Sequence, residues 1–375
     1  KETSVGQYYQ GKMDLWYLFA CRSIDLTRNG GLHSFIATNN WPTQAGARTL
    51  RRKLLNETDL QLFVDFGPYM VFDQASIQTM VYVTQKTGKP NSATTQYVRI
   101  SQSKLSKSAI TKALDTLTSS PALRTMECSI APASDAFTFV DNTDASIIDK
   151  IERAGPMRLS QKEMTQGILA PQENVIPKHL DAGIEAAVGD GIFILSKEEA
   201  AHKHIEAELL RPFFTTAQIL RFGTRDETHQ QLLYVDSKQA QNMSVFPMAR
   251  EHLNRFKKVN TSDNKPYGLH RARKESFFTG PKIVALRKTA RPCFSYSDFP
   301  CFVSQTFNVI GTQRANMEFL TGLLNSSLLA YWFLLKGKRQ GNHYQIDSGP
   351  LRNAPLMEGS DEGIIALVRE LSGLY

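Results

Sequence analysis

The sequence is short of several features that define whole classes of protein. It has only 4 cysteines in 375 residues, at positions 21, 128, 293 and 301, and none belongs to a CxxC pair. A disulfide framework and a zinc ribbon are therefore disfavoured, and a reducing compartment fits best. No run approaches the ~20 apolar residues that span a bilayer, and polar residues 325–327 interrupt the richest stretch, 320–335. The first residues also lack the pattern of a signal peptide.

Common catalytic signatures are missing as well. The chain contains no GxGxxG, no Walker A loop, no HExxH and no Pro-Pro dipeptide. Gly189-Asp190-Gly191 stands alone and is typical of a turn. His202 and His204 are expected to be solvated, and we expect no metal site. The sequence thus offers no argument for metal or nucleophile chemistry.

What the sequence does have is an uneven distribution of charge. The formal net charge is +8, but residues 251–352 carry 16 lysines and arginines against 6 acidic residues, a net +10. The rest of the chain is therefore about −2. Aromatic residues such as Phe277, Tyr296 and Trp332 are interleaved with this charge. A basic region with aromatics is the electrostatic footprint of a nucleic-acid binder, and a solvated basic face is the alternative.

The hydrophobic pattern of residues 11–86 predicts alternating helices and strands. Helices are expected over Met13–Thr27 and Thr43–Leu55, the second of them basic and amphipathic, and strands over Leu32–Thr38, Leu60–Phe66 and Ile77–Gln85. This order predicts an α/β fold, the C-terminal half of a doubly wound, Rossmann-like sheet whose other strands would precede residue 1.

Further along the chain the elements are less regular. We expect strands over Tyr97–Ile100 and Ala136–Val140, helices over Ser106–Leu117 and Ala145–Ala154, and a last clear helix over Glu318–Leu335. Gly155-Pro156 breaks the chain, so a domain boundary is expected there. The prediction is a first domain with its linker over residues 1–155 and an α+β domain over residues 156–375.

Motifs along nearly the whole chain resemble one family. In the first domain these motifs are Gly11-Lys-Met-Asp-Leu-Trp-Tyr-Leu-Phe19, Gly30-Gly-Leu-His-Ser-Phe-Ile-Ala-Thr-Asn-Asn-Trp41, Leu50-Arg-Arg-Lys-Leu-Leu55, Val64-Asp-Phe66 and Val71-Phe-Asp-Gln-Ala75. They resemble the later half of an adenine-specific DNA methyltransferase of the gamma class, the TaqI type. In the second domain the motifs are Thr261–Arg273, Pro281–Ile283, Leu320–Ser326, Lys336–Asn342 and Tyr344–Asp347. They resemble the target-recognition domain of type IIG restriction–modification enzymes.

The resemblance implies a site-specific adenine-N6 methyltransferase of the bacterial cytoplasm, with S-adenosylmethionine as cofactor and double-stranded DNA as partner. The family's Asn/Asp/Ser-Pro-Pro-Tyr/Phe loop and its cofactor-binding loops would lie upstream of Gly11. The chain is therefore expected to be a fragment, or one half of a split enzyme, and to be inactive alone. A nuclease domain upstream stays open. The alternatives are a non-catalytic DNA-binding specificity subunit and an RNA methyltransferase.

The resemblance also assigns residues to the pocket. Phe72 matches the family position that stacks on the extrahelical adenine, although an apolar loop anchor would look the same. Phe19 matches the aromatic residue beside the adenine of S-adenosylmethionine, and its spacing from Leu15 equally fits a core residue. Asn39, Asn40 and Trp41 follow a predicted strand at its carboxyl end, where open α/β sheets bind ligands.

Two clusters in the basic segment are candidate DNA contacts. The first comprises Lys265, Tyr267, His270, Arg271 and Arg273, for which Pro266 and Gly268 predict a loop. The second comprises Lys336, Lys338, Arg339, Asn342 and Tyr344, just past a predicted helix, where basic residues also complement the helix dipole. Arginine suits guanine edges and lysine suits phosphates. Which cluster reads bases stays open.

Overall fold

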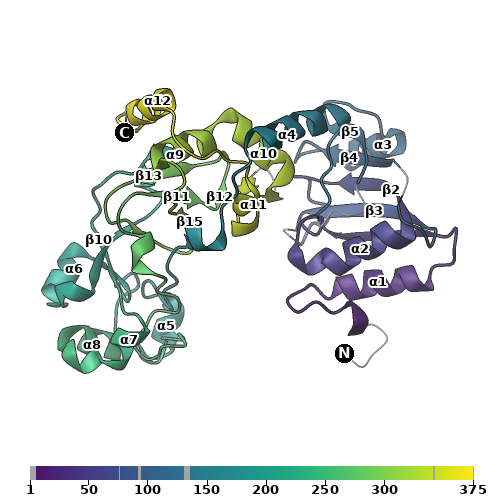
Figure 1. The fold of residues 1–375 in the computed structure, drawn as a ribbon. Coiled ribbons are helices and arrows are strands. Elements are labelled where there is room, and N and C mark those ends of the chain that lie inside the picture. The colour runs from purple at the N-terminus through teal and green to yellow at the C-terminus, as the bar shows by residue number, and fades with distance from the viewer. Residues whose placement is uncertain (1–5, 76, 92–93, 131–135, 341–342, 375) are drawn as a thin grey trace. The chain divides into compact units, whose positions relative to one another are not determined.

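The computed structural model describes residues 6–75, 77–91, 94–130, 136–340 and 343–374. The chain forms two compact units. The first contains residues 1–153 and also residues 332–345, and the second contains residues 154–331 and 346–375. In Figure 1 the helices and strands of residues 1–153 run from purple to blue.

A five-stranded mixed sheet forms the centre of the first unit. Its strands are β1 (Leu32–Thr38), β2 (Thr58–Asp65), β3 (Thr79–Lys86), β4 (Thr95–Ile100) and β5 (Leu123–Cys128). They lie in the order β1-β3-β2-β4-β5, with β3 antiparallel to both of its neighbours and β4 parallel to β2. Strands β1 and β2 therefore run in the same direction and end at the same edge of the sheet.

Helices pack on both faces of this sheet (Figure 1). They are α1 (Trp16–Leu26), α2 (Arg48–Glu57), α3 (Lys107–Thr116) and α4 (Asn142–Ala154). Tyr17, Ala20 and Ile24 recur at helical spacing on one side of α1 and are buried in one apolar cluster. Ile110 of α3 belongs to a second cluster, with Val98 of β4. Only the β2–β4 pair is parallel, so the sheet is mixed, and an apolar cluster on each of its faces is what an α/β unit with helices on both sides requires.

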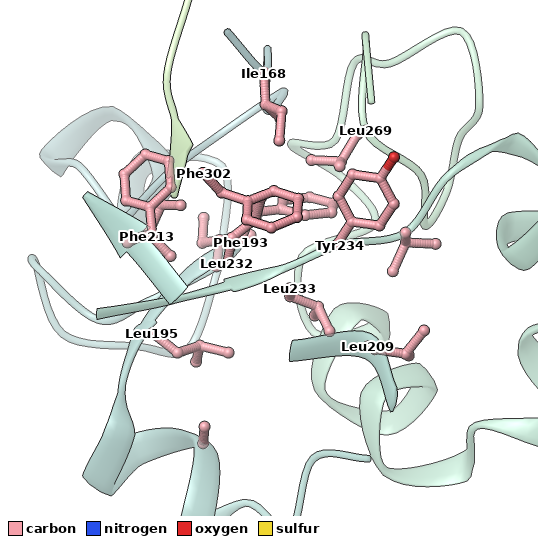
Figure 2. Packing of buried hydrophobic residues seen from close by; sticks show 14 of the residues in the cluster. Ile168, Phe193, Leu195, Leu209, Phe213, Leu232, Leu233, Tyr234, Leu269 and Phe302 are labelled. Atoms are coloured by element: carbon pink, nitrogen blue, oxygen red, sulfur yellow. The ribbon is translucent and has the colours of Figure 1, made fainter. Parts of the chain in front are cut away.

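The second unit contains two further sheets. Strands β14, β8, β10 and β7 form one of them in that order, and β6, β15, β11, β13 and β9 form the other. The strands are β6 (Met164–Gln166), β7 (Ile194–Ser196), β8 (Leu210–Phe214), β9 (Phe222–Gly223), β10 (Gln230–Leu233), β11 (Lys282–Leu286), β13 (Phe294–Ser297), β14 (Phe302–Val303) and β15 (Phe307–Ile310). The short strand β12 (Lys288–Thr289) belongs to neither of these two sheets. Figure 2 shows part of the core of this unit, where Phe193, Leu232 and Tyr234 pack near Phe302.

Short helices connect these strands. They are α5 (Pro177–Asp181), α6 (Lys197–His202), α7 (Ser237–Gln241), α8 (Pro247–Asn254), α9 (Met317–Asn325), α10 (Ser327–Lys336), α11 (Ser348–Asn353) and α12 (Glu362–Ser372). After α10, the strands β16 (Lys338–Gln340) and β17 (His343–Gln345) pair as an antiparallel hairpin within the first unit. In the described residues no single helix is long and apolar enough to cross a membrane, and only the bent pair α9 and α10 reaches that length together.

The predicted α/β class is confirmed, and most predicted elements are present. Three expectations are wrong: residues 136–140 form no strand, the helix expected over Glu318–Leu335 is two helices broken at Ser326, and it is not the last clear helix, because α12 follows near the end of the chain. Strand β5 was not predicted. The helix expected to be basic and amphipathic also differs, because Arg51 and Lys53 of α2 are buried.

Arg51 and Lys53 tolerate burial because each has partners. The Arg51 guanidinium donates to the carbonyl oxygens of Trp41 and Gln44, at 2.7 and 2.6 Å. The Lys53 ammonium lies 2.6 Å from Asp25 and 2.8 Å from Glu57. A buried charge is stable only when it is paired and hydrogen-bonded. These two basic residues of α2 are thus structural and do not belong to a solvated face.

Candidate functional site

A small cavity lies at the edge of the sheet where β1 and β2 end. Its volume is about 120 Å³, and Asn39 and Asn40, directly after β1, are part of its wall. The rest of the lining includes Asp65 at the end of β2, Arg99 of β4 and the aromatic ring of Phe139. Carboxyl ends of parallel strands are where open α/β sheets place their ligands. The cavity therefore has the position expected of a binding site.

Asp65 organises the polar side of this cavity. Its side chain is only 4% exposed, and it accepts four hydrogen bonds. Asn39 Nδ2 and the backbone N–H of Gly67 donate to Oδ1, at 3.0 and 2.9 Å. The Tyr97 hydroxyl and the Arg99 guanidinium donate to Oδ2, both at 3.0 Å. One carboxylate thus holds the segments that follow β1 and β2 against β4.

The charge of Asp65 is matched by Arg99. Burial acts to lower the pKa of Arg99, but the negative charge of Asp65 and the interaction with Tyr97 together outweigh it and raise that pKa. Burial raises the pKa of Tyr97, and the neighbouring carboxylate of Asp65 raises it further. Tyr97 is therefore a neutral hydrogen-bond donor at physiological pH, and Arg99 is a cation. A buried ion pair whose remaining lone pairs are all satisfied fixes geometry well.

Neither Tyr97 nor Arg99 was identified from the sequence. Asp65 was noted only as the centre of Val64-Asp-Phe66, with no role. The signal that could have indicated Asp65 is a carboxylate at the end of an apolar strand, next to Gly67 with its φ of +53°. Its partners come from β4, whose pairing beside β2 joins residues more than 30 positions apart. Local sequence carries little information on such a pairing.

The predicted pocket residues have different positions. Asn39 and Asn40 both line the cavity. Trp41 does not, because it is fully buried in the core between Phe63 and Phe137. Phe72 lies in the loop between β2 and β3 with 47% of its surface exposed.

Phe19 projects from the outer side of α1. It is 69% exposed, so the alternative that it is a core residue is wrong for this unit. Leu15, which caps the start of α1, and Leu26 at its end are also exposed, so the helix has apolar side chains on both its buried and its outer side. Strand β1 adds exposed Leu32 and Ile36 at the edge of the sheet. Leu32 and Ile36 alternate with Phe35, which packs in the same cluster as α1, so they lie on the sheet face opposite to α1. Exposed apolar side chains thus flank β1 on both faces, and exposed apolar surface is typical of places where another chain or segment binds.

The first basic cluster does form a loop, as predicted, but its members have separate partners. Arg271 donates to Asp263 at 2.9 Å, and Arg273 donates to the carbonyl oxygen of Gly167 at 3.3 Å. The Tyr267 hydroxyl donates to Asn254 at 2.9 Å, and His270 Nε2 lies 3.4 Å from the Thr261 hydroxyl. Lys265 is exposed.

The second basic cluster belongs to the first unit, although it follows most of the second unit in sequence. Lys336 ends α10, and its ammonium lies 4.0 Å from Glu152 of α4. Lys338 and Arg339 lie in β16, and Tyr344 of β17 pairs with Arg339. Asn342 lies outside the described residues. Among the described residues, no three histidine, cysteine, aspartate or glutamate side chains come together as metal ligands.

Comparison with known proteins adds to this geometry. Residues 1–72 match the family model of the Eco57I restriction-modification methylase, and residues 241–356 match that of the TaqI-like C-terminal specificity domain. No curated protein matches the chain in sequence.

Solved structures of restriction–modification enzymes are among those that resemble the chain. One is the type IIL restriction-modification enzyme MmeI in complex with DNA, with a TM-score of 0.59 and 12% identity over 98% of this chain and 46% of MmeI. Another is the type IIG restriction endonuclease BpuSI, with a TM-score of 0.36 and 14% identity over 97% of this chain and 45% of BpuSI. The likeness to MmeI shows a shared fold, and this chain spans about half the length of MmeI.

The family models confirm the resemblance read from the motifs. The methylase match contains β1, β2 and the loop up to Phe72. The specificity-domain match contains the loop with Arg271 and Arg273. The chain therefore carries part of a restriction-modification methylase in residues 1–72 and a TaqI-like C-terminal specificity domain in residues 241–356.

Proposed function

We propose that this chain is the C-terminal part of a site-specific DNA adenine-N6 methyltransferase of a bacterial restriction–modification system. Residues 1–155 would complete the methyltransferase domain on its target-base side, and residues 156–375 would recognise the DNA sequence. The observation that carries the proposal is the cavity at the ends of β1 and β2, inside the unit that begins with the methylase match. Its place of work would be the cytoplasm, where bacterial DNA lies.

The pocket suits an extrahelical base. A methyltransferase must take adenine out of the duplex, which costs a few kcal/mol of stacking and pairing. Phe72 does not line the cavity itself, but its ring is exposed in the loop that follows β2 and would replace about 1–3 kcal/mol of that stacking if it packed on the base. Asn39 is fixed by Asp65, so its amide contributes to the wall of the pocket without a search through rotamers. Preorganised positions of this kind lower the entropic part of the barrier.

The cofactor would meet only a small part of this chain. S-adenosylmethionine, when bound, supplies the methyl group, which passes to the adenine amino nitrogen. Phe19 fits a role beside the cofactor's adenine, because its ring is exposed on α1 and has apolar Leu15 one turn away. The groups that polarise the amino group would come from a loop upstream of Gly11.

The exposed face of α1 and β1 supports the presence of such an upstream half. β1 is an edge strand, and exposed edges beside apolar side chains invite pairing with another strand. If the sheet continued past β1, the added strands and the helices beside them would cover the free edge of β1, with Leu32 and Ile36 on one face and the exposed side of α1 on the other. The upstream half would then supply both the cofactor loops and the cover for this surface.

A methylation assay with and without the upstream half tests the proposal. The chain is incubated with tritiated S-adenosylmethionine and unmethylated genomic DNA, first alone and then with the separately expressed upstream half. We expect DNA binding but no methyl transfer by the chain alone, and methyl transfer by the mixture. Transfer by the chain alone would contradict the assignment of the catalytic loop to the upstream half. DNA binding with no transfer by the mixture would favour the non-catalytic specificity subunit.

A further inference from the structure

A large open cleft in the second unit is lined by positive charges, most of which belong to neither of the two predicted clusters. Its volume is about 900 Å³, and three segments form it, at residues 161–166, 273–277 and 348–352. Four basic residues line it, and none of its lining residues is acidic: the cations are Lys162, Arg273, Lys274 and Arg352. Of these only Arg273 was a candidate from the sequence. The last two segments lie inside the specificity-domain match.

The acidic residues that are next in sequence to the cleft residues form ion pairs with basic residues outside the cleft. Glu163, which follows Lys162, accepts from the Arg314 guanidinium at 2.8 Å. Glu275, which follows Lys274, pairs with Arg211.

The same holds for the third segment, where Asp347, next to Ser348, pairs with Arg287 at 2.8 Å. No ion pair joins the four cations of the cleft to a carboxylate within the part of the chain that the structure describes. Such a surface has an unbalanced positive potential that attracts polyanions.

Arg273 is held in place before any ligand arrives. Its backbone has a φ of +64°, a conformation that non-glycine residues rarely adopt. The Tyr234 hydroxyl donates to its carbonyl oxygen at 3.1 Å, and its side chain donates to Gly167 at 3.3 Å and to Gln166 Oε1 at 3.5 Å. Burial and the positive charge of Arg271 lower the pKa of Arg273. Its neighbours thus leave its positive charge uncompensated.

We propose that this cleft binds the phosphate backbone of duplex DNA, with Lys162, Lys274 and Arg352 as phosphate contacts and Arg273 fixed beside Gln166. The inference rests on the proposed function and assigns its DNA contacts to a surface that shares only Arg273 with the two predicted clusters. Arg271, by contrast, is paired with Asp263 and would have to break that ion pair to reach DNA. Phosphate contacts supply most of the sequence-independent affinity for DNA and make it salt-dependent.

Salt-dependent binding of a fluorescein-labelled 30-base-pair duplex of random sequence tests the assignment. The full chain is compared with Lys162→Gln/Lys274→Gln and with the control Lys178→Gln/Lys197→Gln, which removes two exposed lysines outside the cleft lining. Each lost phosphate contact lowers the slope of log K against log salt by about 1. We expect the cleft variant to lose about 2 from the slope and the control to keep the slope of the unchanged chain.

The outcomes separate the cleft from the function. If the unchanged chain and the control bind DNA and the cleft variant has the same slope, the cleft assignment is wrong and the proposed function stands. If the unchanged chain binds no duplex at all, DNA binding itself fails, and the cleft assignment fails with it. Tighter binding to an RNA duplex of the same sequence would also contradict the proposal. Far-ultraviolet circular dichroism of each variant checks that the fold is kept.

Discussion

Replacing Asp65 with asparagine should destabilise the first unit strongly. The amide NH2 of asparagine would take the place of Oδ2 and face two donors, the Tyr97 hydroxyl and the Arg99 guanidinium. Arg99, whose side chain is only 18% exposed, would also lose its buried counter-charge. Removing one partner of a buried ion pair typically costs about 3–5 kcal/mol. We therefore expect Asp65→Asn to lower the free energy of unfolding of this unit by about 3 kcal/mol or more.

Tryptophan fluorescence during urea unfolding measures this loss directly. The 3 tryptophans of the chain, at positions 16, 41 and 332, all lie in the first unit, so their emission follows that unit alone. With a urea dependence of about 1–3 kcal/mol per molar, the midpoint should fall by roughly 1–3 M. The matched control is Asp73→Asn, an exposed aspartate in the β2–β3 loop, which should change stability by less than about 0.5 kcal/mol. A similarly small effect of Asp65→Asn would refute the reasoning.

Three further predictions concern the base, the buried histidine and the exposed helix. In the full-length protein, Phe72→Ala should weaken binding of the extrahelical adenine by about 1–3 kcal/mol, measured by 2-aminopurine fluorescence at the target position. Burial lowers the pKa of His252 to about 4 from its ordinary 6.5, so the stability that His252 contributes above pH 6.5 should disappear as the pH falls towards 4. Denaturation at several pH values should show this loss in the unchanged chain and not in His252→Gln. Leu15→Glu with Leu26→Glu should leave the urea midpoint unchanged, because both side chains are exposed, and should reduce binding to the upstream half at least about tenfold.

Each of these predictions has an outcome that would contradict it. Unchanged 2-aminopurine fluorescence would make Phe72 a packing residue. An equal pH dependence in His252→Gln would assign the acid sensitivity to other groups, and His202→Gln, an exposed histidine, is the control. Undiminished association of the Leu15 and Leu26 variant would place the upstream half on another surface.

The sequence was most informative where local pattern decides structure. The strand over Leu32–Thr38 was predicted with its observed bounds, because a short apolar run after two glycines leaves few alternatives. The strand predicted over residues 136–140 also rested on a local pattern, and here that prediction is wrong. Phe137 and Phe139 do enter the core, with Phe139 stacked on Tyr97 at 4.3 Å, but the backbone that carries them is irregular. An alternating pattern indicates which side chains are buried, and pairing with a neighbouring strand is a separate, long-range condition.

The residues of the candidate site also fall into those that local sequence could predict and those that depend on long-range pairing. Asn39 and Asn40 could be predicted because the end of a strand is a local feature, and the exposed loop position of Phe72 fits the motif that carried its resemblance. The hydrogen bonds of Asp65 could not be predicted, since they depend on β4 lying next to β2. The basic cleft could not be predicted either, because it too depends on contacts between distant parts of the sequence. Its cations come from three segments about 75 to 110 residues apart, and its character depends on which nearby carboxylates are already paired.

The central claim is that the complete protein methylates adenine in DNA at the amino nitrogen. The most direct measurement is nucleoside mass spectrometry of genomic DNA from a methylation-deficient bacterial host that expresses the full-length protein. We predict N6-methyladenine in that DNA and none in the same host expressing residues 1–375 alone. Methylated cytosine without N6-methyladenine, methylated adenine only in RNA, or N6-methyladenine produced by residues 1–375 alone would contradict it.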